Sequence, residues 1–404
     1  MARIQPFCGV RFNTADITRL ICPPYDVISD NEKKRLKKLS ANNFVRIELP
    51  DETAGTNKYQ QANAVFIALR AKGVLCKDAD PALYFYEQVF KDHGRRMVRR
   101  GFFAALELEN PQGGAVKPHE RTLSKPKEDR LKLIRSVRAN LSPIFGLFHD
   151  KNLAVVNLCA RLAKTVCDAR AKDEEGTIHK VWKVTDPRTI AVVVKTLAPQ
   201  KVFIADGHHR YETAWNYFQE QKKKDKKYSP ASAYGKVMIF LCPMEDAGLS
   251  VWPTHRVVVP PAELEARIEK YFTVLPASAF KKLSHSSPQP LLVYLDGAYR
   301  TLAIKNKRCL KTMMPGKCAA YRQLGVSILH ALLLADVAPE SITYVKNDVD
   351  AVALARSRSC MAVMVPSTPI EAIKDIALAG QTMPQKSTYF YPKVASGIVV
   401  HAFR

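Results

Sequence analysis

The sequence predicts a protein of mixed α+β class with several lobes. Its 404 residues are 47% hydrophobic, and at roughly 100–200 residues per domain this length predicts about two or three domains. Strand-like segments rich in β-branched and aromatic residues occur along the whole chain, with helical patterns between them. The two kinds of segment do not alternate regularly, so the pattern does not indicate a doubly wound parallel sheet.

The first lobe is expected over residues 1–110. Apolar residues recur at helical spacing near 58–72, which predicts a helix there. Two strands are expected at 82–89 and 99–108, and the dipeptide His-Gly between them indicates a hairpin at 92–94. This lobe is therefore expected to contain both helices and paired strands.

A second lobe is expected over 111–233 and a third over 234–404. In the second, an apolar strand at 143–148 is followed by another at 201–206, which runs directly into an amphipathic helix. The third continues with strands at 237–241, 291–295 and 301–304, with helices at 261–271, 323–335, 348–357 and 369–379, and with a last strand at 397–403.

The chain is strongly basic, with 62 Lys and Arg against 38 Asp and Glu, a net charge of +24 and a pI of about 9.6. Nucleic-acid binding usually needs a concentrated basic surface, because affinity comes from neutralising many phosphates together. Here the basic clusters are short and scattered. We interpret most of this charge as solvated faces, with an anionic partner or a small phosphorylated ligand as the alternative.

Cysteine usage and hydropathy predict a soluble, cytoplasmic protein. No stretch approaches the roughly 18 apolar residues that cross a bilayer, and the first residues lack the apolar core of a secretory signal. The nine cysteines form no Cys-x-x-Cys pair, so neither a zinc knuckle nor a disulfide framework is expected. We expect reduced thiols that pack as small apolar side chains.

The strongest local signal is the turn from Asp206 to Arg210. Gly207 follows an apolar strand directly and permits a tight turn into a helix, whose first N–H groups and dipole favour an anion. His208, His209 and Arg210 add donors for phosphate oxygens, and Asp206 is placed to hold Mg²⁺ beside them. The alternative is that Asp206 caps the helix and the histidines are surface residues.

A second segment, Lys117-Pro118-His119-Glu120, precedes a charged helix that carries Arg130. A glutamate beside a histidine in a loop is a candidate general base for a hydroxyl group, a role that typically contributes about 10²–10⁴ in rate. The alternative is a solvated loop that leads into the helix.

Two further loops have a similar character. Pro23 and Pro24 fix a loop that presents Tyr25 and Asp26, and its alternative is a structural turn. Near the C-terminus, Lys386 beside the hydroxyls of Ser387 and Thr388 suits a phosphate, and a plain loop at a strand edge is the alternative.

Several common enzyme motifs are absent from the sequence. There is no Gly-x-x-x-x-Gly-Lys-Ser/Thr, no Gly-x-Gly-x-x-Gly, no Gly-x-Ser-x-Gly and no His-Glu-x-x-His. The sequence therefore lacks the main motif of each of four classes: P-loop NTPases, dinucleotide-binding Rossmann domains, α/β-hydrolases and zinc enzymes of the His-Glu-x-x-His type.

Over essentially its whole length the chain resembles the bacterial domain-of-unknown-function family 1015. The landmarks, in order, are Ile4-Gln5-Pro6-Phe7, Pro23 to Val27, His119-Glu120, Glu128-Asp129-Arg130, Ala139-Asn140, Ala205 to Arg210, and Met383 to Lys393. The Pro-His-Glu loop and the Asp-Gly-His-His-Arg turn are also similar to a pair of motifs in ParB/sulfiredoxin-like free-serine kinases. The resemblance implies a nucleotide-binding core of that kind, over 111–233, within a larger protein whose third lobe closes the site.

The resemblance implies a kinase that uses ATP or ADP with Mg²⁺ and phosphorylates a small hydroxyl compound, first of all free L-serine. Glu120 would then be the base, His208, His209 and Arg210 the phosphate cradle, and Asp206 the carboxylate next to the metal. Position 208 is His where sulfiredoxins have Cys, which excludes sulfiredoxin chemistry. Such a cradle is expected to be exposed and to carry little packing.

The remaining candidates complete the expected site. His119 is placed with Glu120 as a catalytic residue. The nucleotide phosphates are expected to contact Asp206, Gly207, His208, His209, Arg210, Lys386, Ser387 and Thr388. The substrate is expected to contact Tyr25, Asp26, Lys117 and Arg130.

Two other functions stay open from the sequence. One is a ParB-like nucleotide-sensing protein that binds DNA, which the charge of +24 favours, although no convincing helix-turn-helix pattern follows residue 234. The other is a phosphatase or phosphotransferase acting on phosphoserine, because the same cradle would serve the reverse reaction.

Overall fold

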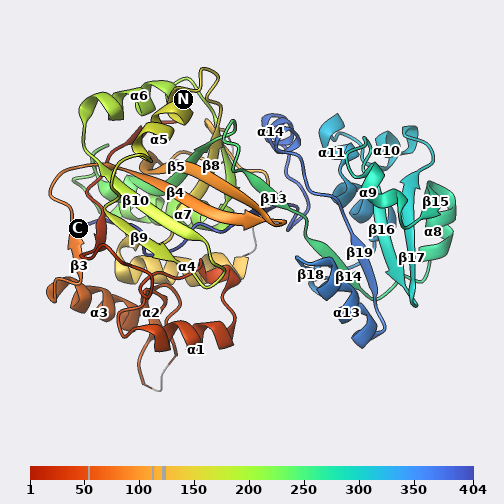
Figure 1. Ribbon diagram of the computed structural model, residues 1–404, viewed down its shortest axis with the longest axis horizontal. Coiled ribbons are helices and arrows are strands. Elements are labelled where there is room, and N and C mark those ends of the chain that lie inside the picture. Colours follow the sequence, from red (N-terminus) through yellow and green to blue (C-terminus); the bar gives the residue numbers. More distant parts are fainter. Residues whose placement is uncertain (53–54, 112, 121–123) are drawn as a thin grey trace. The chain divides into compact units, whose positions relative to one another are not determined.

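The computed structural model describes residues 1–404 apart from 53–54, 112 and 121–123. The chain forms two compact units (Figure 1). Unit 1 comprises Met1–Pro118, Thr122–Ser250 and Pro392–Arg404, and unit 2 comprises His119–Arg121 and Val251–Tyr391. Both contain helices and sheets, which confirms the predicted α+β class.

Unit 1 is built on a nine-stranded sheet in the order β6-β11-β8-β12-β5-β4-β10-β9, with β1 paired to β5. The strands are β1 (Ile4–Gln5), β4 (Leu83–Asp92), β5 (Arg95–Glu107), β6 (Val116–Lys117), β8 (Ile144–Phe148), β9 (Ala169–Lys172), β10 (Ile178–Val184), β11 (Val202–Asp206) and β12 (Lys236–Pro243). The hairpin predicted at 92–94 joins β4 to β5, because His93 and Gly94 both take the positive φ that a tight hairpin requires.

Seven α-helices of unit 1 lie among its described residues: α1 (Asp30–Leu39), α2 (Val45–Glu48), α3 (Lys58–Ala71), α4 (Ser124–Val137), α5 (Ala154–Leu162), α6 (Pro187–Leu197) and α7 (His208–Lys224). Side chains from adjacent loops cap several of them: Ser29 accepts from the third residue of α1, and Asp186 caps α6 in the same way. Two short pairs complete the unit, β2 (Val10–Phe12) with β3 (Leu75–Lys77) and β7 (Ala139–Asn140) with β21 (His401–Ala402).

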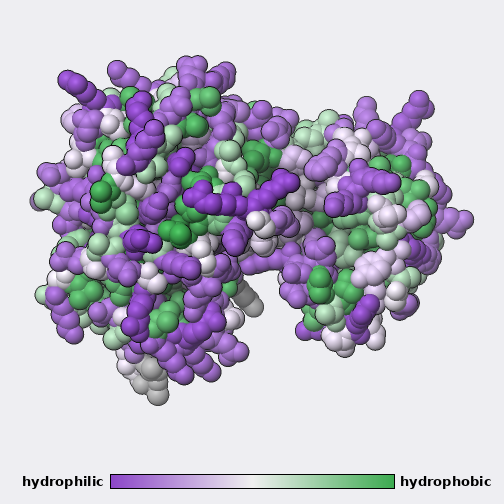
Figure 2. All heavy atoms as spheres, viewed as in Figure 1, coloured by the Kyte–Doolittle hydropathy of each residue, from purple (hydrophilic) through white to green (hydrophobic). Residues whose placement is uncertain are grey.

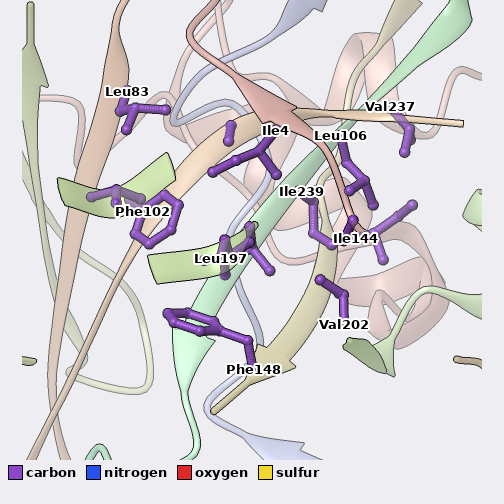
Figure 3. Close-up of a cluster of buried hydrophobic side chains, with 14 of the residues drawn as sticks. Ile4, Leu83, Phe102, Leu106, Ile144, Phe148, Leu197, Val202, Val237 and Ile239 are labelled. Atoms are coloured by element: carbon purple, nitrogen blue, oxygen red, sulfur yellow. The ribbon is translucent and has the colours of Figure 1, made fainter. Parts of the chain in front are cut away.

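The hydrophobic core of unit 1 lies between this sheet and its helices (Figure 3). Phe102 of β5, Ile144 of β8 and Ile239 of β12 point into it, and Leu197 of α6 covers them. Burying an aliphatic or aromatic side chain of this size contributes about 1.5–3 kcal/mol. The core strands β5, β8, β11 and β12 are therefore held in place by this buried cluster.

Unit 2 contains an antiparallel six-stranded sheet in the order β15-β17-β16-β19-β14-β18. Its strands are β14 (His255–Val258), β15 (Phe272–Pro276), β16 (Leu291–Leu295), β17 (Ala298–Ile304), β18 (Thr343–Val345) and β19 (Met361–Met364), and β13 (Ser250–Trp252) pairs separately with β20 (Tyr389–Tyr391). The helices are α8 (Leu264–Tyr271), α9 (Ala279–Leu283), α10 (Arg308–Met313), α11 (Ala319–Gln323), α12 (Gly325–Ile328), α13 (Asp348–Arg358) and α14 (Ile370–Leu378).

The units differ from the three lobes expected from the sequence. β5, β8 and β12 come from all three expected lobes and lie in one sheet of unit 1, because long-range strand pairing is not visible in local patterns. The helix expected at 323–335 divides into α12 and a π-helical turn at Leu329–Leu333. The last strand shortens to His401–Ala402, since Gly397 adopts a φ of 90° and interrupts the extended chain.

Hydrophilic residues cover most of the face shown in Figure 2, with hydrophobic residues scattered among them. Among the residues that the structure describes, no helix is both long and apolar enough to span a membrane. All nine cysteines are free thiols, and Cys22, Cys159 and Cys242 are buried.

Candidate functional site

The turn after β11 is the centre of the candidate site. Phe203, Ile204 and Ala205 are buried, and the pairing of β11 with β8 shifts its register between Ile204 and Asp206. Such a bulge turns the next side chain out of the regular alternation. β11 is thus fixed by its core residues, and its last residue, Asp206, is paired with Phe145 of β8 after the bulge.

Gly207 makes the turn into α7 possible. Its φ is 88°, a left-handed conformation that side chains with a Cβ rarely adopt. A Cβ at this position would also lie 3.0 Å from Nε of Arg210. The first turn of α7, every residue of which the structure describes, contains no acidic side chain. The positive end of the helix dipole therefore stays available to an anion.

Asp206 is held between two cations. Nη2 of Arg210 lies 2.6 Å from its Oδ2, and Nζ of Lys393 lies 2.7 Å from its Oδ1. The Arg210 side chain is 11% exposed and that of Lys393 10%. Arg210 also donates from Nη1 to the carbonyl oxygen of Pro143. The turn is therefore a packed ion-pair cluster, and the expectation of an exposed cradle is wrong for Arg210.

Lys393 is a component of this cluster that the sequence analysis did not assign to the site. Its backbone is held by the sheet, because Nε2 of Gln88 donates to its carbonyl oxygen at 3.0 Å. Arg99 is fully buried and donates to two oxygens in this region. One is Oε1 of the Gln88 side chain, and the other is the backbone carbonyl oxygen of Pro392. The sequence feature that could have identified Lys393 is the Pro392-Lys393 pair in the last motif of the family. A lysine in a loop does not by itself indicate a binding site.

Tyr25, Asp26 and Arg130 lie in the same unit as the turn. Arg130 contacts Tyr25, and Tyr25 and Asp26 interact electrostatically with Arg210 of the turn. The guanidinium carbon of Arg130 lies 4.2 Å from the centre of the Tyr25 ring, a cation–π contact. Burial raises the pKa of Tyr25 to about 12. The charge of Asp26 adds to this increase, and the charges of Arg210 and Arg130 oppose it. Burial alone would lower the pKa of Arg210, but the charges of Asp206 and Asp26 outweigh burial and raise it. Three of the predicted substrate residues thus belong to one electrostatic cluster.

Lys117, the fourth predicted substrate residue, is the last residue of β6. β6 runs parallel to β11, and Lys117 is paired with Phe203. Parallel strands leave a sheet at the same edge, so the chain leaves β6 through Pro118 at the edge where β11 leads into Gly207.

The next residues, His119 and Glu120, belong to unit 2. The backbone of Met383 donates to the carbonyl oxygen of His119 at 2.7 Å, and Nε2 of His119 lies 3.2 Å from the hydroxyl oxygen of Thr388. Oε1 of Glu120 accepts from the backbone N–H of Lys386 at 3.1 Å. The structure therefore joins the Pro-His-Glu loop to the Lys386-Ser387-Thr388 loop, two segments that are far apart in the sequence.

Within unit 2, Arg256 supports this pair of loops. It is fully buried, and its Nη2 donates to the carbonyl oxygens of Gln385 and Lys386 at 3.0 and 3.2 Å. Burial lowers the pKa of Arg256 to about 10, opposed by Tyr344 and Glu120, which leaves the side chain charged at neutral pH. Sequence reasoning missed Arg256, because an arginine in a strand is ordinarily a surface residue.

The structure thus distributes the predicted site residues over both units. Unit 1 contains Tyr25, Asp26, Lys117, Arg130, Asp206, Gly207, His208, His209 and Arg210, and unit 2 contains His119, Glu120, Lys386, Ser387 and Thr388. His208 is buried and His209 half-buried, although both were expected to face a ligand.

The residues around Asp206 do not fit a metal site as they are arranged. Both carboxylate oxygens accept from cationic side chains, which repel and compete with a metal ion. Among the residues that the structure describes, no three His, Cys, Asp or Glu side chains are grouped to hold a metal. The metal role of Asp206 stays a prediction.

A family model described as "Protein of unknown function (DUF1015)" matches residues 4–327. The chain belongs to this family. A search of curated proteins found no match. One similar solved structure is a free serine kinase mutant in complex with ADP, 12% identical, covering 68% of this chain and 84% of that chain, with a TM-score of 0.37.

Two further solved structures are similarly distant. SbnI with a C-terminal truncation, from Staphylococcus aureus, is 9% identical and covers 73% of this chain and 85% of that chain, with a TM-score of 0.38. A conserved hypothetical protein from Pyrococcus furiosus is 13% identical and covers 69% of this chain and 89% of that chain, with a TM-score of 0.34.

Proposed function

We propose that this protein is a nucleotide-dependent kinase that transfers a phosphoryl group to the hydroxyl of a small metabolite, with free L-serine as the first candidate. The observation that carries the proposal is the turn at Asp206–Arg210, where a helix N-terminus meets the side chains of Arg210 and Lys393. Phosphoryl transfer depends mostly on positioning and on neutralising phosphate charge. Helix N–H groups, a guanidinium and an ammonium group are the donors that this chemistry requires.

The Asp206 carboxylate explains how two cations are kept side by side before the nucleotide binds. Arg210 and Lys393 would repel each other, and the shared carboxylate offsets this repulsion. When phosphate oxygens approach, they replace or share those contacts with little movement of the cations. Donors that are placed in advance cost no reorganisation at the moment of reaction.

We assign Glu120 as the general base, and we place His119 with it as a catalytic residue. The acceptor oxygen attacks the terminal phosphorus of ATP or ADP, the new O–P bond forms, and the bond to the leaving nucleotide oxygen breaks. The hydroxyl proton passes to a carboxylate oxygen of Glu120, and ADP or AMP leaves. The bond from Lys386 N–H to Oε1 of Glu120 stabilises the ionised carboxylate that this role needs.

The proposal is tested by incubating the purified protein with ATP or ADP, Mg²⁺ and a panel of hydroxy amino acids. Mass spectrometry should detect O-phosphoserine from L-serine with at least one of the nucleotides. Absence of any phosphorylated product, over the whole panel and with both nucleotides, overturns the proposal. Incubating O-phosphoserine with AMP or ADP tests the reverse reaction, which uses the same cradle.

A nucleotide-sensing DNA-binding protein is the second candidate, and the net charge of +24 favours it. A DNA-binding protein releases counterions from the duplex, so its affinity falls steeply and linearly on a log–log plot against salt. Titrating duplex DNA at several salt concentrations separates the candidates. A steep slope without any phosphorylated product supports the DNA-binding candidate.

A further inference from the structure

Unit 1 contains a small cavity with both polar and apolar side chains in its lining. Its volume is about 50 Å³, and its polar lining consists of Glu48, Arg130, Asn140, Ser142, Arg210 and Thr213. A buried water needs roughly 10–15 Å³ of such space, so the cavity has room for several water-sized groups. That is the size of a small metabolite rather than of a nucleotide.

Glu48, the last residue of α2, has an incomplete environment in this cavity. Its side chain is only 1% exposed. The hydroxyl of Ser142 donates to Oε1, but among the described residues Oε2 has no hydrogen-bond partner although it is buried. Burying a carboxylate is costly unless it is paired and hydrogen-bonded. A buried carboxylate oxygen without a partner, on a residue that lines a cavity, therefore points to a ligand that donates to it.

Neighbouring cations leave Oε2 of Glu48 without a hydrogen bond among the described residues. The nearest is Arg130, whose Nη1 lies 4.0 Å from Oε1 of Glu48. Arg130 is engaged elsewhere, because its Nε and Nη2 donate to Asp129 at 2.9 and 2.5 Å. Arg210 is likewise engaged with Asp206. Glu48 thus forms an ion pair with Arg130, but this pair leaves its Oε2 without a hydrogen-bond donor among the described residues.

The two arginines still offer donors to a second group. A guanidinium has five N–H groups. Arg130 uses three of them, two on Asp129 and one on the carbonyl oxygen of Glu48, and Arg210 uses one on Asp206 and one on Pro143. The cavity therefore has an acceptor without a donor at Glu48 and spare cationic donors at Arg130 and Arg210.

We infer that this cavity binds a small α-amino acid, with its ammonium group on Oε2 of Glu48 and its carboxylate facing Arg130 and Arg210. An ammonium group supplies the N–H donors that Oε2 of Glu48 lacks, and guanidinium groups match a carboxylate. The volume admits glycine, alanine or serine and excludes large side chains. A hydroxyl-bearing amino acid held here would be the acceptor of the proposed kinase, but the binding itself requires no nucleotide.

Calorimetric titration of the full chain without nucleotide tests this inference. L-serine, L-alanine and glycine should bind. Ethanolamine, which lacks the carboxylate, and L-lactate, which lacks the ammonium group, should bind at least about ten-fold more weakly, because each loses a charge-assisted contact. L-phenylalanine should not bind. Failure of all three small amino acids to bind overturns the inference, and so does equal binding of L-lactate and L-alanine.

Glu48→Gln tests the residue, and Glu87→Gln is its matched control. Glu87 is also a buried glutamate of unit 1, but both of its oxygens are paired, with Arg100 at 2.8 Å and Lys180 at 2.9 Å. Glu48→Gln should weaken amino-acid binding at least about ten-fold and leave the melting temperature of the ligand-free protein unchanged or higher, because a buried charge with an unsatisfied oxygen is removed. Glu87→Gln should lower the melting temperature and leave the amino-acid Kd unchanged.

The opposite pattern, a melting temperature lowered by Glu48→Gln with amino-acid binding intact, shows a purely structural glutamate and overturns the inference. Binding of small amino acids and phosphorylation of them are separate readouts. If amino acids bind at Glu48 but no phosphorylated product forms, the inference stands and the proposed kinase activity fails.

Discussion

Nζ of Lys393 lies 2.7 Å from Oδ1 of Asp206, although 187 positions separate the two residues in the chain. The C-terminal segment from Pro392 returns to unit 1 and places a cation at the end of β11. Gln88 of β4 fixes the backbone of Lys393 through its carbonyl oxygen. The candidate phosphate site is therefore assembled from residues at both ends of a long sequence interval.

Lys393→Met should weaken nucleotide binding. The substitution keeps the length of the side chain but removes a charge-assisted contact worth about 1.5–3 kcal/mol, which corresponds to roughly ten- to hundred-fold in Kd. Calorimetric titration with ADP measures the change. Lys132→Met is the control, because Lys132 pairs with the exposed Glu128 on α4, and equal losses in the two variants would refute a specific role for Lys393.

Gly207→Ala should lower both stability and nucleotide affinity. The positive φ alone costs roughly 1–2 kcal/mol for a residue with a Cβ, and the new Cβ would also press on Arg210. Gly176→Ala provides the comparison, because Gly176 has a φ of 83° and open space around it. Denaturant unfolding should show a loss in both variants. Only Gly207→Ala should also lose ADP binding. If the two variants bind ADP equally well, the turn at Gly207 does not bind the nucleotide phosphates.

Glu120→Gln should lower kcat at least about 10²-fold while nucleotide affinity stays near that of the wild type, because the amide keeps the shape but accepts no proton. Steady-state kinetics and ADP titration give the two values. The amide can still accept from the N–H of Lys386, as Oε1 of Glu120 does, so folding should be unaffected. Undiminished turnover would remove Glu120 from the mechanism.

Arg210→Ala and His209→Ala should both weaken nucleotide binding but should differ in stability. Arg210 is largely buried and bonds to Asp206 and Pro143, so its removal leaves buried acceptors unpaired and lowers the melting temperature. His209 is half-buried, and its removal should change the melting temperature less. Thermal unfolding with and without ADP measures both effects, and unchanged ADP affinity in both variants would identify the turn as structural.

Acid should destabilise unit 1 partly through Asp129. Burial opposes ionisation of Asp129, but Arg130, Lys58 and Tyr59 outweigh burial and lower its pKa to about 2, against an ordinary value of 3.8. A carboxyl group whose pKa is lower in the folded state contributes stability above about pH 4, and this contribution disappears as the pH falls from about 4 to about 2. The free energy of unfolding, measured with urea between pH 5 and 2.5, should therefore fall more steeply with decreasing pH for the wild type than for Asp129→Asn. Parallel curves would mean that the Asp129 pairs do not stabilise the fold.

Local features of the fold were predictable from the sequence, and long-range ones were not. The hairpin at His93-Gly94 and the strand–turn–helix at Gly207 follow from short-range backbone chemistry, and the structure contains both. The sharing of one sheet by β5, β8 and β12 depends on pairings between distant strands. No local pattern specifies these pairings, so the expected lobes differ from the two compact units.

The same distinction applies to the candidate site. Asp206, Gly207 and Arg210 stand out in the sequence because several polar residues follow a buried strand directly. Lys393 and Glu48 do not, since their significance lies in what they contact or fail to contact. A lysine in a loop and a glutamate at a helix end are ordinary surface residues until the fold buries them.

The most direct test of the central claim is a crystal structure of the protein with bound ADP. We expect the terminal phosphate at the N-terminus of α7, within hydrogen-bond distance of the backbone after Gly207, of Arg210 and of Nζ of Lys393. A bound nucleotide whose phosphates contact none of these groups would contradict the claim that the Asp206–Arg210 turn is the phosphate site.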